Sequence, residues 1–170
     1  LLSKPEIDVN DILSHNVHEY TDIHVLENER TALYIAVKNK RIDIIELLLK
    51  NPNIDVNIRN ISMSYTRSRK HDDYEYIKST ALHMAVEKNN LKIVQLLLQN
   101  PNIDVGIKKY NHSESYGWYG NENDKTKKTA LQLATENRYI LETQESKEDH
   151  SQIIKLLSAF HYKEEESEEN

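Results

Sequence analysis

The fold is decided by the stretch Thr80 to Asn100, T-A-L-H-M-A-V-E-K-N-N-L-K-I-V-Q-L-L-L-Q-N, because close variants of it occur twice more. Upstream, residues 31–37 read T-A-L-Y-I-A-V and residues 42–49 read I-D-I-I-E-L-L-L. Downstream, residues 129–134 read T-A-L-Q-L-A and residues 153–157 read I-I-K-L-L. The three threonines that begin the copies are 49 residues apart. Self-similarity at a fixed period indicates a repeat protein.

Each copy is predicted to form two helices. Lys92, Gln95 and Gln99 recur at i, i+3 and i+7 and leave the rest of the second helix as a wide apolar arc. Such a helix must be covered from both flanks, and in a repeating chain its neighbours cover it. In the shorter first half, Thr80 is a predicted N-cap, and Asn89-Asn90 can end the helix with a left-handed residue.

The motif Thr80-Ala81-Leu82-His83-Met84-Ala85, followed by Leu96-Leu97-Leu98 and Asp104-Val105, resembles the ankyrin repeat, which reads T-P-L-H-x-A over about 33 residues. The resemblance extends over roughly Leu1 to Phe160, apart from insertions. It implies an all-α repeat fold, an ankyrin-type helix-turn-helix solenoid, with extended β-hairpin-like finger loops. It also implies that His83 hydrogen-bonds backbone between repeats. The sequence departs from the family in having Ala for Pro in all three copies.

We expect one array over residues 1–162, followed by an acidic tail at 163–170. The array comprises the end of a preceding repeat and its finger at 1–30, two repeats with long fingers at 31–79 and 80–128, and a C-terminal capping repeat at 129–162. Within the cap, residues 139–150 are predicted to be a surface loop. The first helix pair lacks an upstream partner, so we expect an exposed apolar edge there, and a natural protein that continues N-terminally or has lost an upstream helix.

The fingers are about 16 residues longer than the family's unit requires. Seven of the 12 aromatic residues lie in the two long fingers: Tyr65, Tyr74, Tyr76, Tyr110, Tyr116, Trp118 and Tyr119. Tyr and Trp often anchor protein interfaces, whereas solvated linkers are poor in aromatic residues. The alternative is that these rings pack on one another to order the long fingers, and both uses are compatible.

Composition argues against several functions. The net charge of −6 disfavours sequence-independent nucleic-acid binding, which needs clustered Lys and Arg. No apolar run approaches the roughly 20 residues that cross a bilayer, and there is no cysteine for a disulfide framework. An intracellular, cytoplasmic protein is therefore the expectation. The acidic tail is interpreted as a solvated end in preference to a docking element.

The usual compact catalytic signatures are absent from the sequence, which has no cysteine nucleophile, Gly-rich phosphate loop or H-E-x-x-H pair. We therefore predict no enzyme and no cofactor. The remaining metal candidate is His15, His18, Asp22 and His24, because histidines at i and i+3 could meet on a helical turn and bind zinc. Exposed loop histidines are the favoured interpretation, so no metal site is predicted.

The predicted function is a protein–protein interaction module or scaffold, monomeric as a module, that binds a protein partner through the concave side of its first helices and its aromatic fingers. The alternative is a structural spacer within a longer array, with no ligand of its own. By resemblance to ankyrin repeats, the predicted contact residues lie at finger bases, on first helices and along the fingers: Arg30, Ser79, Lys128, Lys38, Asn39, Glu87, Lys88, Glu136, Asn137, Tyr65, Tyr74, Tyr76, Tyr116, Trp118 and Tyr119.

Overall fold

The computed structural model consists of three helix pairs joined by three β-hairpins, and it describes residues 8–19, 24–67, 71–117, 120–136 and 143–168. The helices are α1 (Ala32–Lys38), α2 (Ile42–Leu49), α3 (Ala81–Glu87), α4 (Leu91–Leu98), α5 (Ala130–Glu136) and α6 (Gln144–Glu168). The strands are β1 (Ile12–Glu19), β2 (His24–Thr31), β3 (Asn60–Arg67), β4 (His71–Ser79), β5 (Lys108–Gly117) and β6 (Gly120–Thr129).

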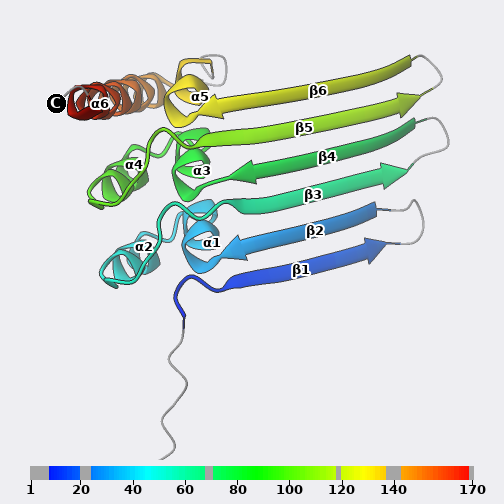
Figure 1. Ribbon diagram of the computed structural model, residues 1–170, viewed down its shortest axis with the longest axis horizontal. Coiled ribbons are helices and arrows are strands. Elements are labelled where there is room, and N and C mark those ends of the chain that lie inside the picture. Colours follow the sequence, from blue (N-terminus) through cyan, green and yellow to red (C-terminus); the bar gives the residue numbers. More distant parts are fainter. Residues whose placement is uncertain (1–7, 20–23, 68–70, 118–119, 137–142, 169–170) are drawn as a thin grey trace, which may run out of the picture.

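The helix pairs stack in chain order, as the repeat predicts. Helices α1, α3 and α5 lie next to the strands and contact one another in succession, whereas α2, α4 and α6 lie on the far side (Figure 1). Thr31 and Thr80 cap α1 and α3 by accepting a hydrogen bond from the backbone N–H three residues on. Asn89 has a φ of 47°, so the predicted left-handed helix end is confirmed. Lys40 adopts the same region at the equivalent turn, with a φ of 55°.

The core lies between the stacked helices, and its exposure changes along the array. Ile93, Val94, Leu97 and Leu98 of α4 are all buried, because this helix has a neighbour on each flank. In α2 only Ile45 is buried, and Leu47 remains 69 % exposed. Ile12, Leu13 and Ile44 are also exposed large hydrophobic residues at this end. The predicted apolar edge at the first helix pair is thus confirmed.

The fingers form a single six-stranded antiparallel sheet in the order β1-β2-β3-β4-β5-β6. Hairpins were predicted, but neighbouring hairpins also pair with each other: Val25 lies opposite Tyr65 across β2 and β3, and Tyr76 lies opposite His112 across β4 and β5. The all-α class is therefore wrong in this respect. Helix stacking places each hairpin beside the next, and the inserted residues give the hairpins strands of 8 to 10 residues. When two exposed strand edges lie side by side, the free backbone N–H and C=O groups of one edge can bond to those of the other.

The last helix is longer than predicted. Residues 144–150 belong to α6 and not to a surface loop, and α6 continues through the acidic residues as far as Glu168. The hydroxyl of Thr143 accepts a hydrogen bond from Ser146 N at 3.1 Å and caps this helix. His150, Ile153 and Leu157 are buried at successive turns of α6 and form its core-facing stripe. The polar residues 144–149 extend this helix toward its N-terminus.

Asparagine side chains tie the turns of successive repeats together. Asn57 donates to Asn102 O at 2.7 Å and accepts from Asp104 N at 3.0 Å. One repeat earlier, Asn10 makes the same pair of bonds to the turn that follows it, with Asn53 O and Asp55 N, both at 2.8 Å. Gly106 occupies the equivalent position in the third copy and has no side chain to continue the series.

We predict that Asn57→Ala lowers the free energy of unfolding by about 1–2 kcal/mol, because both hydrogen bonds of one inter-repeat clamp are lost. Urea denaturation followed by circular dichroism measures the change. Asn102→Ala is the matched control, since Asn102 takes part in the clamp through its backbone carbonyl, and we expect less than about 0.5 kcal/mol for it. Equal effects of the two substitutions would contradict the clamp.

His83 is buried at the junction between α3 and β5, and the expected bond to backbone is confirmed. Lys109 N–H donates to its Nε2 at 3.0 Å, and its Nδ1 faces the Thr80 backbone N–H at 3.2 Å and the Thr80 hydroxyl at 2.7 Å. Burial lowers the pKa of His83 from 6.5 to about 4, and the neighbouring charge of Lys109 acts in the same direction. Protonation of Nε2 would also direct its N–H at the backbone N–H of Lys109, so that two donors would face each other.

Acid should therefore destabilise the protein through His83. The unfolded chain binds this proton at a higher pH than the folded chain does, so the stability from this group is complete above pH 6.5 and is lost as the pH falls to about 4. The full loss is about 3 kcal/mol. Urea denaturation across this range measures it. His83→Gln is the control, because Gln132 accepts from Thr129 N at 2.9 Å at the same position of the third copy; an unchanged acid dependence in this variant would refute the assignment.

Candidate functional site

The sheet presents two faces of different chemistry. Residues directly opposite on neighbouring strands share a face, as do residues two apart along a strand. Tyr65 lies opposite Tyr74, Met63 opposite Tyr76, and Tyr76 opposite His112, so these side chains share one face. We call it the aromatic face; its members include Ile61, Met63, Tyr65, Tyr74, Tyr76, Lys78, Tyr110, His112, Glu114, Tyr116, Lys125 and Lys127.

The rings of the aromatic face form one continuous cluster. Tyr74 meets His112 edge to face, with centroids 6.0 Å apart, and Tyr76 meets Tyr110 in the same way at 6.1 Å. Tyr110 and His112 are 6.3 Å apart and join the two pairs. These are favourable geometries for aromatic pairs. The Tyr74–His112 and Tyr76–Tyr110 contacts each join β4 to β5, so these rings also hold neighbouring fingers together.

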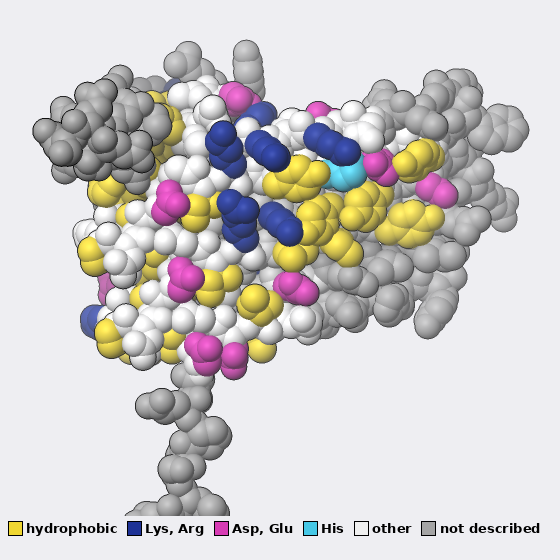
Figure 2. Space-filling view, viewed as in Figure 1, with side chains coloured by type: hydrophobic (Ala, Val, Ile, Leu, Met, Phe, Trp, Pro, Cys, Tyr) yellow, Lys and Arg dark blue, Asp and Glu magenta, His cyan; other side chains and the backbone are white. Residues whose placement is uncertain are grey.

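Carboxylates hold the tyrosines toward the finger ends. Tyr65 Oη donates to Asp72 at 3.3 Å, and Tyr116 Oη donates to Glu114 at 2.7 Å. The second bond raises the pKa of Tyr116 and lowers the pKa of Glu114. Tyr116 remains 49 % exposed, and the other tyrosines of the cluster are half-buried. In Figure 2 the hydrophobic side chains of this face form a row over the strands, with Lys and Arg side chains beside it.

The opposite face of the sheet, which we call the inner-helix face, meets α1, α3 and α5 at its base. Tyr34 Oη and Ser79 Oγ are 3.0 Å apart, and they join α1 to the end of β4. The ammonium groups of Lys109 and Lys128 form ion pairs with Glu87 on α3 and Glu136 on α5. Each lysine at the base of this face therefore has a carboxylate partner on a helix.

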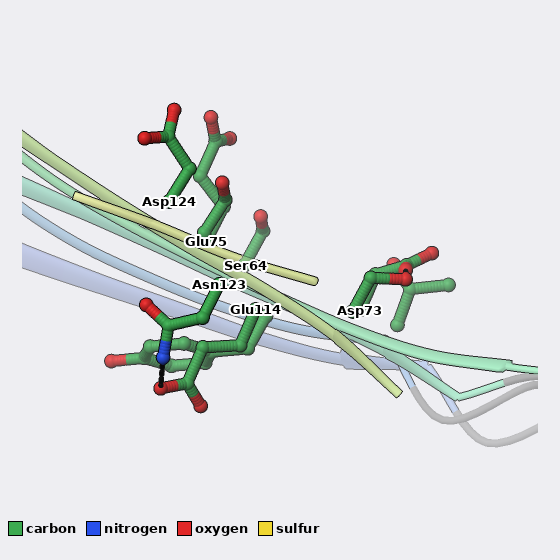
Figure 3. A pocket seen from close by; sticks show the side chains of 10 residues that line it. Ser64, Asp73, Glu75, Glu114, Asn123 and Asp124 are labelled. Carbon is green, nitrogen blue, oxygen red and sulfur yellow. Dashed lines mark hydrogen bonds between the residues drawn. The ribbon is translucent and has the colours of Figure 1, made fainter. Parts of the chain in front are cut away.

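Farther along the fingers the inner-helix face carries hydroxyl and acidic side chains around a shallow cavity of about 690 Å³. Its lining from this face is Ser64, Thr66, Asp73, Glu75, Ser113, Ser115 and Asp124. In Figure 3, Ser64, Glu75 and Asp124 lie on one side of the strands, and Glu114 and Asn123 lie on the other, joined at 3.0 Å. The lining suits a polar or cationic group. Within the described residues no group of three His, Asp or Glu is placed to hold a metal ion.

The zinc candidate rested on a helical turn, and the structure places His15 and His18 in strand β1 and His24 in β2. The helical spacing on which the prediction depended is therefore absent. Asp22 lies outside the described residues.

The predicted contact residues are divided between the two faces of the sheet. Lys38, Asn39 and Lys88 are exposed at the ends of α1 and α3, and Glu87, Lys128 and Glu136 are the ion-paired residues at the base of the inner-helix face. Arg30 is on the inner-helix face too, because its neighbour Glu29 lies opposite Ile61 of the aromatic face. Tyr65, Tyr74, Tyr76 and Tyr116 all lie on the aromatic face. Trp118, Tyr119 and Asn137 are outside the described residues.

Two corrections concern individual positions. Ser79 is only 2 % exposed and bonded to Tyr34, so its side chain is not accessible to a partner. Tyr110 and His112 were not among the predicted contacts, although they join the ring pairs. The alternation Tyr74-x-Tyr76 and Tyr110-x-His112 has the period of a strand and is the signal that could have grouped them.

The family model of the ankyrin repeat matches residues 28–61 and 78–110. Comparisons with curated proteins and with solved structures gave no match. Of the helices described, none is long and apolar enough to cross a membrane. The two matched segments contain the α1/α2 and α3/α4 pairs and the helix-side ends of the strands that flank them. Capping threonines, left-handed turns and stacked apolar helices have been described there. The chain thus contains two ankyrin repeats, at residues 28–61 and 78–110.

Proposed function

We propose that this chain is a protein-binding module that holds its partner mainly on the aromatic face of the finger sheet. Ankyrin repeats generally mediate protein–protein interaction. The observation that carries the proposal is that the tyrosines of the described finger strands gather on one face, partly exposed, each held by a neighbouring ring or a carboxylate. Half-exposed tyrosines in a contiguous group are the usual anchors of protein interfaces.

The arrangement lowers the cost of binding. A tyrosine has two side-chain torsions, and its ring here is already positioned by a neighbouring ring or a carboxylate. Six paired strands support the rings, so little backbone entropy is lost when a partner covers them. A partner would gain apolar contact with the rings and find Lys, Glu and Asp at the rim to set its orientation.

The inner-helix face is the second surface in this proposal. Lys38 and Lys88 are exposed at the helix ends, and burial together with the charges of Arg30 and Lys88 lowers the pKa of Lys38. Asp73, Glu75 and Asp124 lie farther out on the same face. A partner there would meet positive charge near the helices and negative charge along the fingers, which favours one binding orientation.

The alternative function is a structural spacer, and one observation favours it. The edge-to-face contacts join β4 to β5, so the rings already stabilise finger pairing without a ligand. We further propose that the module is not an enzyme and that it is a monomer located in the cytoplasm. In this proposal residues 1–162 form one array. The acidic residues at 163–168 continue α6 in this array.

The test measures, for each variant, both the capture of a partner and the thermal stability of the protein. We expect affinity capture from the source cell, quantified by mass spectrometry, to recover a protein with the intact chain and at least about tenfold less of it with Tyr76→Ser/Tyr116→Ser. Lys92→Ser/Lys155→Ser, at exposed positions on α4 and α6 outside both surfaces, is the matched control and should retain most of it. Thermal melting of all three proteins accompanies the capture. Undiminished capture by the tyrosine variant, together with a large fall in its melting temperature, would favour the spacer.

A further inference from the structure

A pocket at the base of the aromatic face collects positive charge. Its volume is about 680 Å³, and four of its nine lining residues are cationic: Arg59, Lys78, Lys108 and Lys127. The rings of Tyr76 and Tyr110 form its apolar wall. We call it the basic pocket. Such a concentration of positive charge is unexpected in a chain whose net charge is −6.

The strand register explains why the charges converge. Lys78 of β4 and Lys127 of β6 lie on either side of Tyr110 in one row across the sheet. Adjacent strands are about 4.8 Å apart, so the two lysines start roughly 10 Å from each other. Lys78 Nζ is 5.4 Å from the centroid of the Tyr76 ring, a cation–π contact. Figure 2 shows the Lys and Arg side chains grouped beside the hydrophobic row.

These cations differ from those of the inner-helix face in having no carboxylate partner. Lys109 and Lys128 each pair with a glutamate, whereas none of Arg59, Lys78, Lys108 and Lys127 forms an ion pair within the described part of the chain. The only acid in the lining is Asp104, and its Oδ1 accepts a hydrogen bond from Gly106 N at 2.8 Å as part of the turn. The cations therefore repel one another, and an anionic ligand would relieve that repulsion.

We propose that the basic pocket docks an acidic segment of a protein partner, with its carboxylates on these cations and an apolar side chain against Tyr76 and Tyr110. The inference rests on the proposed function and adds the chemistry of the partner. Charge complementarity supports it, since four cations beside two rings match several carboxylates next to an apolar group.

A protein segment fits the surroundings better than a nucleic acid does. A nucleic-acid strand needs a basic track many phosphates long. Here the positive region is bounded along the sheet by Glu114 and Asp72, which lie farther out on the same face, and by exposed Glu29 on β2. A short acidic segment can end before it reaches these carboxylates.

The test uses three fluorescent probes: a peptide of roughly 12 residues made of Glu with two Phe, its twin with Gln for every Glu, and oligouridylate of similar length and charge. Fluorescence anisotropy measures the binding of each. We expect the acidic peptide to bind, to weaken as salt rises, and to bind about tenfold less tightly to Lys78→Gln/Lys127→Gln. The matched control Lys92→Gln/Lys155→Gln removes the same charge from exposed positions on α4 and α6, and we expect a change of less than about twofold.

Each contrary outcome overturns the inference. These are no binding of the acidic peptide, equal binding of the Gln twin, equal weakening by both lysine variants, or binding of the oligonucleotide as tight as that of the peptide. Capture of the partner by the two variants distinguishes failure of this inference from failure of the proposed function. If Tyr76→Ser/Tyr116→Ser loses that partner and Lys78→Gln/Lys127→Gln keeps it, the acidic chemistry is wrong and the module stands. If both variants keep it, binding on the aromatic face is itself wrong.

Discussion

The contact on which the structure depends is the stacking of the inner helices. Ala36, Ala85 and Ala134 stand 49 residues apart and are almost fully buried between α1, α3 and α5, where small side chains let the helices approach closely. Packed helices lie about 8–10 Å apart, and two sheet strands occupy about the same distance. Each helix pair thus advances the chain by the width of one hairpin, and the hairpins meet edge to edge as a sheet.

The sheet has a functional consequence that separate loops would not have. In a paired strand, alternate side chains must point to opposite faces. The tyrosines therefore gather on one face with unpaired lysines, whereas hydroxyl and acidic side chains gather on the other with the ion-paired lysines. Mobile loops would mix these groups. The sheet fixes two surfaces that differ in charge and apolar character.

Local features were predictable from the sequence because they depend on neighbours in the chain. The caps at Thr31 and Thr80, the left-handed Asn89 and the His83 bond to backbone follow from short motifs. Pairing between hairpins was not predictable in this way, since β2 and β3 are brought together by helix stacking and not by a turn. The division of the predicted contact residues between two faces depends on that register. The early start of α6 was missed because residues 144–149 are polar throughout, and their helix is fixed by the Thr143 cap and by the buried stripe that follows.

Backbone amide hydrogen exchange along β2 to β5 tests the central claim most directly. If helix stacking joins the fingers into one sheet, the amides that link β2 to β3 and β4 to β5 should exchange far more slowly than those of an unstructured peptide, with protection that extends from the helices toward the middle of the strands. Exchange at unstructured rates between the hairpins, while the helices stay protected, would show that the fingers are independent and would contradict the account.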